Sequence, residues 1–270
     1  QGTTDGSCGG WTDFAYLLKS SVMKSRRVSY VLIDYDNFFE RDVPSPESFQ
    51  HEVNRLIRHV VGLDTHVTEV DIRLYGGWMQ SGVLTSRGSD VQSAVAAEHH
   101  FPVPHPTASG LLRGRVTLVT RLIGVPDIEW PDTYSVRNGL PRLRLQENSP
   151  PESCGLNRES CPIHVLRRFA SRKQKNCSVE SCTMTNAKAF RVMRQNMVDT
   201  MIACDLLALA GGDDVHTISL LSDDTDHHPA VFMASKTHPR PTALVMTNRK
   251  LAEQTQETLK SSRAQVACWS

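Results

Sequence analysis

YVLIDYDNFF (residues 30–39) joins an apolar run to two aspartates, Asp34 and Asp36, and then returns to aromatic residues. The apolar run begins at Val28 and is rich in β-branched and aromatic side chains, which is typical of a buried strand. A carboxylate at the end of such a strand loses hydration, so its charge needs a partner. The stretch therefore predicts a buried strand that ends in functional or structurally paired acids.

Strand and helix patterns alternate along the rest of the chain, as judged from hydrophobic periodicity and turn residues. The expected elements are, in order, a strand at 28–34, a helix at 49–63, a strand at 66–78, a short helix near 90–99, strands at 115–125 and 141–146, a long helix at 186–210, a strand at 215–222, and then helix, strand, helix and strand up to residue 269. This alternation predicts an α/β fold with a mainly parallel sheet.

The composition is that of an ordinary globular protein. The chain has 270 residues, of which 39% are hydrophobic and 22% are charged, enough for one large domain or a domain with an insertion. Lys and Arg number 30 against 29 Asp and Glu, so the net charge neither requires nor excludes a nucleic-acid partner. No apolar run reaches the roughly 18 residues that a membrane-spanning helix needs, so no membrane partner is expected.

The N-terminus and the cysteines indicate where in the cell the protein is expected to reside. Residues 1–27 are expected to form a flexible segment, because QGTTDGSCGG has neither a starting Met nor an apolar signal core. The chain has seven cysteines, an odd number, whereas a secreted disulfide scaffold would be shorter and evenly paired. A reducing, cytoplasmic location is therefore expected.

Acidic residues cluster at the ends of two expected strands and in one expected helix. They are Asp34 and Asp36, then Asp223, Asp224 and Asp226, and in the helix Asp199 and Asp205. The carboxyl ends of parallel strands meet at one edge of a sheet, where clustered carboxylates repel one another unless a cation neutralises them. Oxygen ligands of this kind favour Mg²⁺ or Mn²⁺. The alternative is structural: Asp36, Asp223 or Asp224 caps the turn or helix that follows it.

The middle of the chain is expected to hold an insertion, at about residues 110–184, inside a domain that covers 28–270. Four cysteines with the spacing C-x6-C-x15-C-x4-C fall in it: Cys154, Cys161, Cys177 and Cys182. Four thiolates close in sequence can form a tetrahedral zinc site that orders a small module. Independent free thiols remain the alternative.

The insertion is also basic. Around the cysteines, between residues 137 and 175, its cationic residues are Arg137, Arg142, Arg144, Arg158, Arg167, Arg168, Arg172, Lys173 and Lys175, against three acids, Glu147, Glu152 and Glu159. Such a module can hold the backbone of a nucleic acid beside a metal site, although a solvated charged surface has the same composition. Outside it, Arg73 and Arg87 are further candidate phosphate contacts.

Three motifs resemble those of an NYN domain, a branch of the PIN-like nuclease superfamily. They are IDYDN (33–37), QNMVDTMIACDLL (195–207) and LSDDTD (221–226), and the likeness covers about 28–78 and 185–269. The resemblance implies a three-layer α/β/α PIN-like domain that cleaves nucleic acid, RNA rather than DNA, in the manner of an endoribonuclease.

The resemblance also implies roles for individual residues. Asp34, Asp199, Asp224 and Asp226 would bind Mg²⁺ or Mn²⁺ and carry out catalysis, with Asn37 as a nearby polar partner. The candidate substrate contacts are Asn37, from the resemblance, and five basic residues chosen for their charge, Arg73, Arg167, Arg168, Arg172 and Lys173. A protein partner or a homo-oligomer is compatible with this interpretation.

Departures from the family pattern leave two alternatives open. Asp223 stands where the family has glycine, Asn196 and Met197 stand where it has Lys-Gly, and His227 replaces an aromatic residue. An inactive NYN scaffold that only binds RNA or protein is one alternative. The other is a phosphohydrolase similar to the HAD family, with Asp34 as a nucleophile that forms an aspartyl-phosphate.

Overall fold

A computed structural model describes residues 28–269, apart from 40–44, 64–66, 98–100, 105–109, 139–154, 158, 171–174, 179–180 and 196. Its centre is a seven-stranded sheet in the order β13-β12-β11-β1-β2-β6-β5. All neighbouring strands pair in parallel except β5 and β6. The strands are β1 (Val28–Asp34), β2 (Glu69–Tyr75), β5 (Val103–Pro104), β6 (Leu111–Leu118), β11 (Val215–Leu221), β12 (Thr242–Met246) and β13 (Gln265–Cys268).

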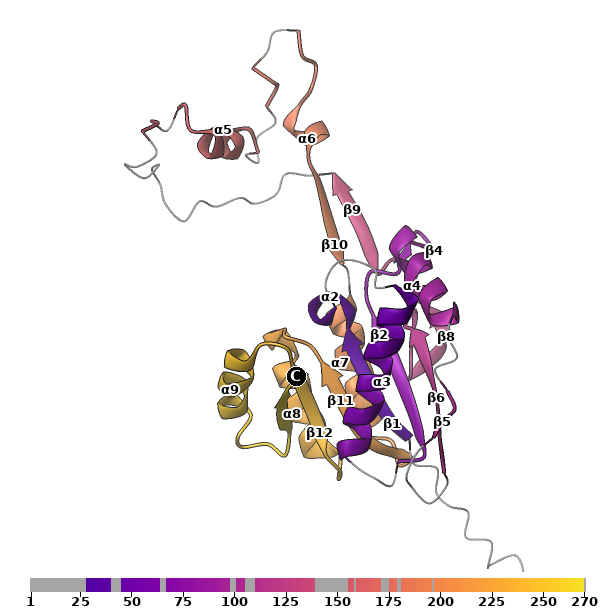
Figure 1. Cartoon of the computed structure of the whole chain (residues 1–270). Coiled ribbons are helices and arrows are strands. Elements are labelled where there is room, and N and C mark those ends of the chain that lie inside the picture. The colour runs from indigo at the N-terminus through magenta and orange to yellow at the C-terminus, as the bar shows by residue number, and fades with distance from the viewer. Residues whose placement is uncertain are drawn as a thin grey trace, which may run out of the picture.

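Helices cover both faces of this sheet (Figure 1). On one face, α3 (Pro46–Leu63) and α4 (Ser86–Ala97) bury Phe49 and Val91 against the strands. On the other, α7 (Val198–Ala210), α8 (His228–Thr237) and α9 (Arg249–Thr258) build a second core. The α/β class with a mostly parallel sheet is confirmed, and the layers are those of a three-layer α/β/α fold.

The position of β1 follows from its sequence. Every residue of VSYVLID except Tyr30 is buried, as expected for a strand with neighbours on both edges and helices on both faces. β1 pairs with β11 through Ile33 and Leu221 and with β2 through Asp34 and Tyr75. The carboxyl ends of β1 and β11 therefore lie side by side, with the loops that follow them at one edge of the sheet.

The long helix expected at 186–210 is wrong. The segment contains a short helix, α6 (Asn186–Ala189), then strand β10 (Arg191–Gln195), and only then α7. β10 pairs antiparallel with β9 (Tyr134–Asn138), and Met197 has a φ of 63°, which ends the ribbon and opens α7. Pairing with a strand about fifty residues earlier overrides the helical spacing of the local sequence.

The inserted segment extends from the sheet as an arm, carried by the β9–β10 ribbon and holding α5 (Pro162–Phe169) and α6 (Figure 1). The insertion was expected to begin near residue 110. It begins after Leu118, because β6 belongs to the central sheet. The expected strand at 141–146 and the N-terminal segment 1–27 lie outside the described residues.

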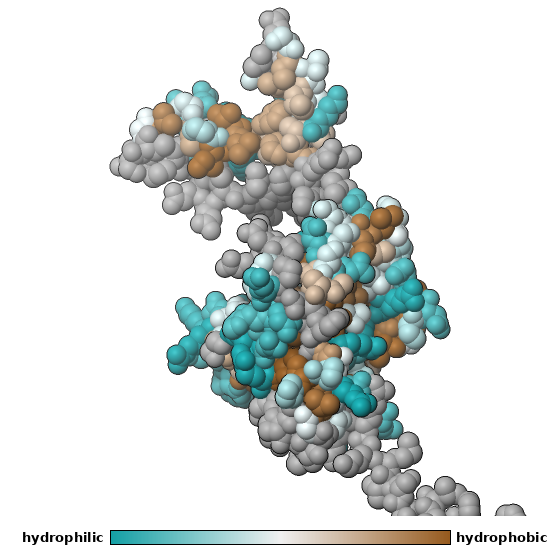
Figure 2. All heavy atoms as spheres, turned by 45° about the vertical axis from the view of Figure 1, so that its right-hand side comes forward, coloured by the Kyte–Doolittle hydropathy of each residue, from teal (hydrophilic) through white to brown (hydrophobic). Residues whose placement is uncertain are grey.

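Two small antiparallel hairpins lie outside the central sheet. The first pairs β3 (Met79–Gln80) with β4 (Val83–Leu84) and lies between β2 and α4, and the second pairs β7 (Arg121–Leu122) with β8 (Val125–Glu129) and lies between β6 and the arm. Figure 2 shows a mostly hydrophilic body and apolar side chains gathered on the arm, where Ile163, Val165 and Leu166 are exposed. Among the described residues, no helix is long and apolar enough to cross a membrane.

Candidate metal centre

Asp34 is the last residue of β1, and its side chain is fully buried, with 0% exposure. One carboxylate oxygen, Oδ2, accepts hydrogen bonds from Nδ2 of Asn37 at 2.6 Å and from Oγ of Ser222 at 2.9 Å. The other oxygen, Oδ1, has no hydrogen-bond partner among the described residues. Because a buried carboxylate oxygen without a partner is costly, this atom points to a ligand that supplies positive charge.

Asp199 approaches Asp34 from the first turn of α7. Asp34, Asp199 and His227 each offer a ligand atom, and these three atoms lie within 4.8 Å of one another. Burial raises the pKa of Asp199; nearby His227 lowers it, and the carboxylates of Asp34, Asp224 and Asp226 raise it further. A cation between the three side chains would remove the repulsion that disfavours the ionised form of Asp199.

His227 reaches the same site from the short 3₁₀ helix η2 (Thr225–His227), which follows β11. Its ring is buried, with 1% exposure, and Nε2 lies 3.4 Å from Oδ2 of Asp34. In the sequence, His227 was noted only because the NYN family has an aromatic residue at this position. Its place directly after DDTD was a signal, since imidazole is a common metal ligand and the preceding acids already indicated a metal site.

Asp224 and Asp226 lie near this group but outside it. Oδ1 of Asp224 accepts a hydrogen bond from the backbone N–H of Asp226 at 2.8 Å and so caps η2. The side chain of Asp226 is exposed. Both carboxylates contribute to the negative potential around Asp199. Their direct ligation of a metal stays a prediction, while the capping role considered for Asp224 is confirmed.

The remaining acids of the expected cluster have other partners. Asp223 binds the turn between β12 and α9, where its Oδ1 accepts from the backbone N–H of Thr247 at 2.7 Å and its Oδ2 accepts from the Thr247 hydroxyl. Asp36 forms an ion pair with Arg87 of α4. The extra acid at 223 therefore anchors a loop, and Arg87 is held by a neighbouring carboxylate.

The prediction that Arg73 contacts substrate is wrong. Its side chain is buried, with 7% exposure for the residue, and its Nη2 donates to Asp205 at 2.9 Å and to the backbone carbonyl of Arg121. Asp205 has 0% exposure and also accepts from the Tyr75 hydroxyl at 2.6 Å and from the backbone N–H of Ile123 at 2.7 Å. This network ties α7 to β2 and β7, and its arginine is not available to a ligand.

The arm carries the remaining predicted residues. Arg167 and Arg168 lie in the last turn of α5, and Arg168 donates to the backbone carbonyl of Glu159. Arg172, Lys173 and Cys154 lie outside the described residues. Cys161 is buried and Cys177 and Cys182 are half-buried, but the described part of the arm brings no three candidate ligands together. The zinc site therefore stays a prediction.

Comparisons with protein-family models, with curated proteins and with solved structures gave no match. The chemistry of the site thus depends on its own donors, two carboxylates and one imidazole. This set fits a divalent cation: carboxylates are the ligands of Mg²⁺ and Mn²⁺, and an imidazole shifts the preference away from Mg²⁺ towards a softer ion such as Mn²⁺.

Proposed function

We propose that this protein is a metal-dependent nuclease that hydrolyses phosphodiester bonds in RNA, as an endoribonuclease of the NYN and PIN-like kind. The observation that carries the proposal is the buried Asp34 carboxylate, whose Oδ1 lacks a hydrogen-bond partner among the described residues, beside Asp199 and His227. The site lies at the carboxyl edge of a parallel sheet, where ligands of α/β proteins bind.

Asp34, Asp199 and His227 would hold the metal, with Asp224 and Asp226 adding negative charge at the rim. A bound Mg²⁺ or Mn²⁺ supplies Lewis acidity, which activates water and neutralises the charge that develops on a phosphodiester. Asn37 and Ser222 hold Oδ2 of Asp34 in a fixed orientation. This fixed geometry limits the reorganisation that binding would otherwise require.

The surroundings of Asp36 argue against a covalent phosphohydrolase. In that mechanism the second acid of D-x-D acts as the general acid beside the nucleophile. Here the Asp36 carboxylate forms an ion pair with Arg87, whose guanidinium lies 5.2 Å from the centroid of the Tyr35 ring. The Asp36 carboxylate is thus engaged by a side chain of α4, away from the general-acid role that this mechanism requires.

The substrate class is inferred from charge. Arg167 and Arg168 on α5 belong to the basic arm that extends from the body carrying the acids (Figure 1). Cations that hold a phosphate backbone next to a metal site are what a nuclease needs. The choice of RNA over DNA comes from the resemblance to PIN-like nucleases.

The test is a cleavage assay with labelled RNA, DNA and a phosphomonoester in Mn²⁺, Mg²⁺ or EDTA. The variants are Asp34→Asn and Asp199→Asn, with Asp36→Asn as the matched control two residues from Asp34. We expect chain cleavage that requires metal, is lost in the first two variants and persists in the control.

Other outcomes assign other functions. Monoester hydrolysis with a trapped phospho-enzyme, lost in Asp36→Asn, would assign the covalent mechanism. Binding of RNA without turnover in any metal would indicate the inactive scaffold.

A further inference from the structure

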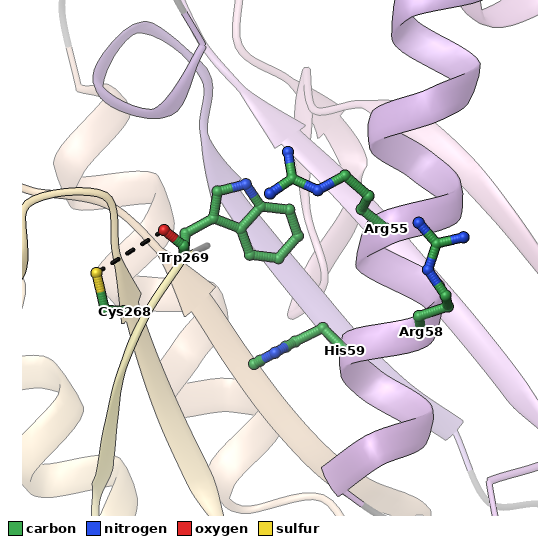
Figure 3. A pocket seen from close by; sticks show the side chains of 5 residues that line it. All are labelled: Arg55, Arg58, His59, Cys268 and Trp269. Atoms are coloured by element: carbon green, nitrogen blue, oxygen red, sulfur yellow. Dashed lines mark hydrogen bonds between the residues drawn. The ribbon is translucent and has the colours of Figure 1, made fainter.

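A pocket of about 240 Å³ lies between α3 and the end of β13. Its walls are Arg55, Arg58 and His59 on one side and Cys268 and Trp269 on the other (Figure 3). The volume is roughly eight times the 30 Å³ that one water molecule occupies in the liquid, so it has room for a phosphate group and its ester oxygens. None of the described residues that line it is acidic.

The three α3 residues share one helical face, because positions three and four apart are neighbours on a helix. The Arg55 guanidinium lies 4.6 Å from the centroid of the Trp269 ring, and its Nη1 donates to both carboxylate oxygens of Glu52, at 2.8 and 3.0 Å. Its orientation is thereby fixed, while Glu52 offsets part of its charge. Arg58 is exposed, and no ion pair is found for it with another described residue.

His59 adds a neutral donor or acceptor to the pocket wall. Its Nε2 is buried and has no hydrogen-bond partner among the described residues. Burial lowers the pKa of His59 below its ordinary value of 6.5, so the ring is uncharged at neutral pH. A buried ring nitrogen in the wall of a cationic pocket can bond to an oxygen of a bound ligand.

The pocket is coupled to the acidic site through α2 (Tyr35–Phe38). Asn37 donates to Asp34, and the next residue, Phe38, has its ring centroid 5.3 Å from that of Trp269. Trp269 follows β13, which lies three strands from β1 in the sheet order. At about 4.8 Å per strand spacing, pocket and acids are roughly 14 Å apart along the same edge.

We propose that this pocket binds a backbone phosphate of a single-stranded nucleic acid, a few nucleotides from the phosphodiester held at Asp34 and Asp199. At the 3.4 Å axial rise of a stacked helical strand, about 14 Å is spanned by about four nucleotides, and an extended single strand spans it with fewer. Arg58 supplies the uncompensated positive charge, Arg55 a fixed guanidinium, and His59 a neutral hydrogen-bonding atom. The inference rests on the proposed function in taking nucleic acid as the ligand.

The test measures binding of a fluorescent single-stranded RNA to the full chain by anisotropy, in EDTA so that no metal-dependent cleavage occurs, over a range of salt concentrations. Each phosphate contact contributes about 0.7 to the slope of log K against log salt for a single strand. We expect Arg58→Ala to lower that slope by about 0.7 and Arg58→Lys to restore it. Arg113→Ala is the matched control, an exposed arginine at the amino end of β6 and so at the opposite edge of the sheet.

A second readout depends on no substitution. Cys268 is exposed in the pocket wall and Cys204 is exposed on α7, on the other face of the sheet. Bound RNA should slow alkylation of Cys268, followed by mass spectrometry of its peptide, and leave Cys204 unchanged.

An unchanged salt slope in Arg58→Ala, equal protection of both cysteines, or no RNA binding at all would overturn the inference. Cleavage is measured separately with metal. A protein that binds RNA through this pocket without cutting it would contradict the proposed function alone.

Discussion

Replacing Asp205 with asparagine tests whether two acids of the same helix, α7, have different roles. Asp205 should contribute to stability and Asp199 to metal binding. Asp205 is fully buried in α7 and accepts from Arg73, Tyr75 and the backbone of Ile123. Asp199, in the first turn of the same helix, is exposed and part of the candidate metal group. The matched variant is therefore Asp199→Asn.

The size of the expected loss of stability follows from the effect of Asp205→Asn on Arg73. The Arg73 guanidinium remains buried and loses its carboxylate, a change that costs about 3–5 kcal/mol. For a chain of this size, each kcal/mol lowers the unfolding midpoint by about 2–4 °C, so we expect a loss of roughly 10 °C. Tyr75→Phe should cost only about 1 kcal/mol, because it removes one of several hydrogen bonds to Asp205.

Asp199→Asn should leave the free energy of unfolding unchanged or slightly higher. Because the pKa of Asp199 is raised in the folded state, its ionised form is destabilising at neutral pH, and a neutral amide removes that contribution. The same substitution should abolish metal binding.

The assay is urea unfolding followed by tryptophan fluorescence in EDTA, with Mn²⁺ titrations of the folded proteins alongside. A loss below about 1 kcal/mol for Asp205→Asn would refute the role of the buried network. An equal loss of stability in Asp199→Asn would refute the division of roles between the two acids.

Three further outcomes are expected. His227→Ala should weaken Mn²⁺ binding, measured by electron paramagnetic resonance, by more than about 100-fold. The control, Asp226→Ala, should retain binding within about tenfold. Similar losses in the two variants would contradict the assignment of His227 as a ligand. Burial lowers the pKa of His238 below 6.5, so unfolding takes up a proton and stability should fall below about pH 6.5, by up to about 1.4 kcal/mol per pH unit. The fall of stability with decreasing pH should be less steep in His238→Gln. An identical slope would exclude His238 as its cause. If the predicted zinc site exists, metal analysis should find one zinc per chain, lost in Cys161→Ser.

Much of the fold could be predicted because its main strands carry local signals. The run at Val28–Asp34 and the similar one at Val215–Leu221 are rich in apolar residues and buried almost throughout. Parallel pairing between them follows from the helices that separate strands in the chain. The helix expected at 186–210 failed because β10 owes its conformation to β9. Such a distant partner leaves no trace in local periodicity.

The candidate site, too, could be predicted only in part. Asp34 and Asp199 could be identified as neighbours because strand ends and helix starts meet at one edge of a parallel sheet. The pattern of acids alone did not separate Asp205 from Asp199, which only the family resemblance singled out, and it did not separate Arg73 from a surface arginine. Their difference is burial at a contact between positions 73 and 205, which only the packing of α7 on β2 creates.

The sequence by itself determined the class of fold and the edge of the sheet at which acids gather, and it predicted the kind of cation that they would bind, because strand and helix patterns and ligand chemistry are local properties. Only the tertiary structure decided which side chains share the site. It turned Asp223 towards Thr247 and Asp36 towards Arg87, and it placed His227 against Asp34. Side chains adjacent in sequence diverge because each points where its own backbone position and its partners direct it, and those partners come from distant segments.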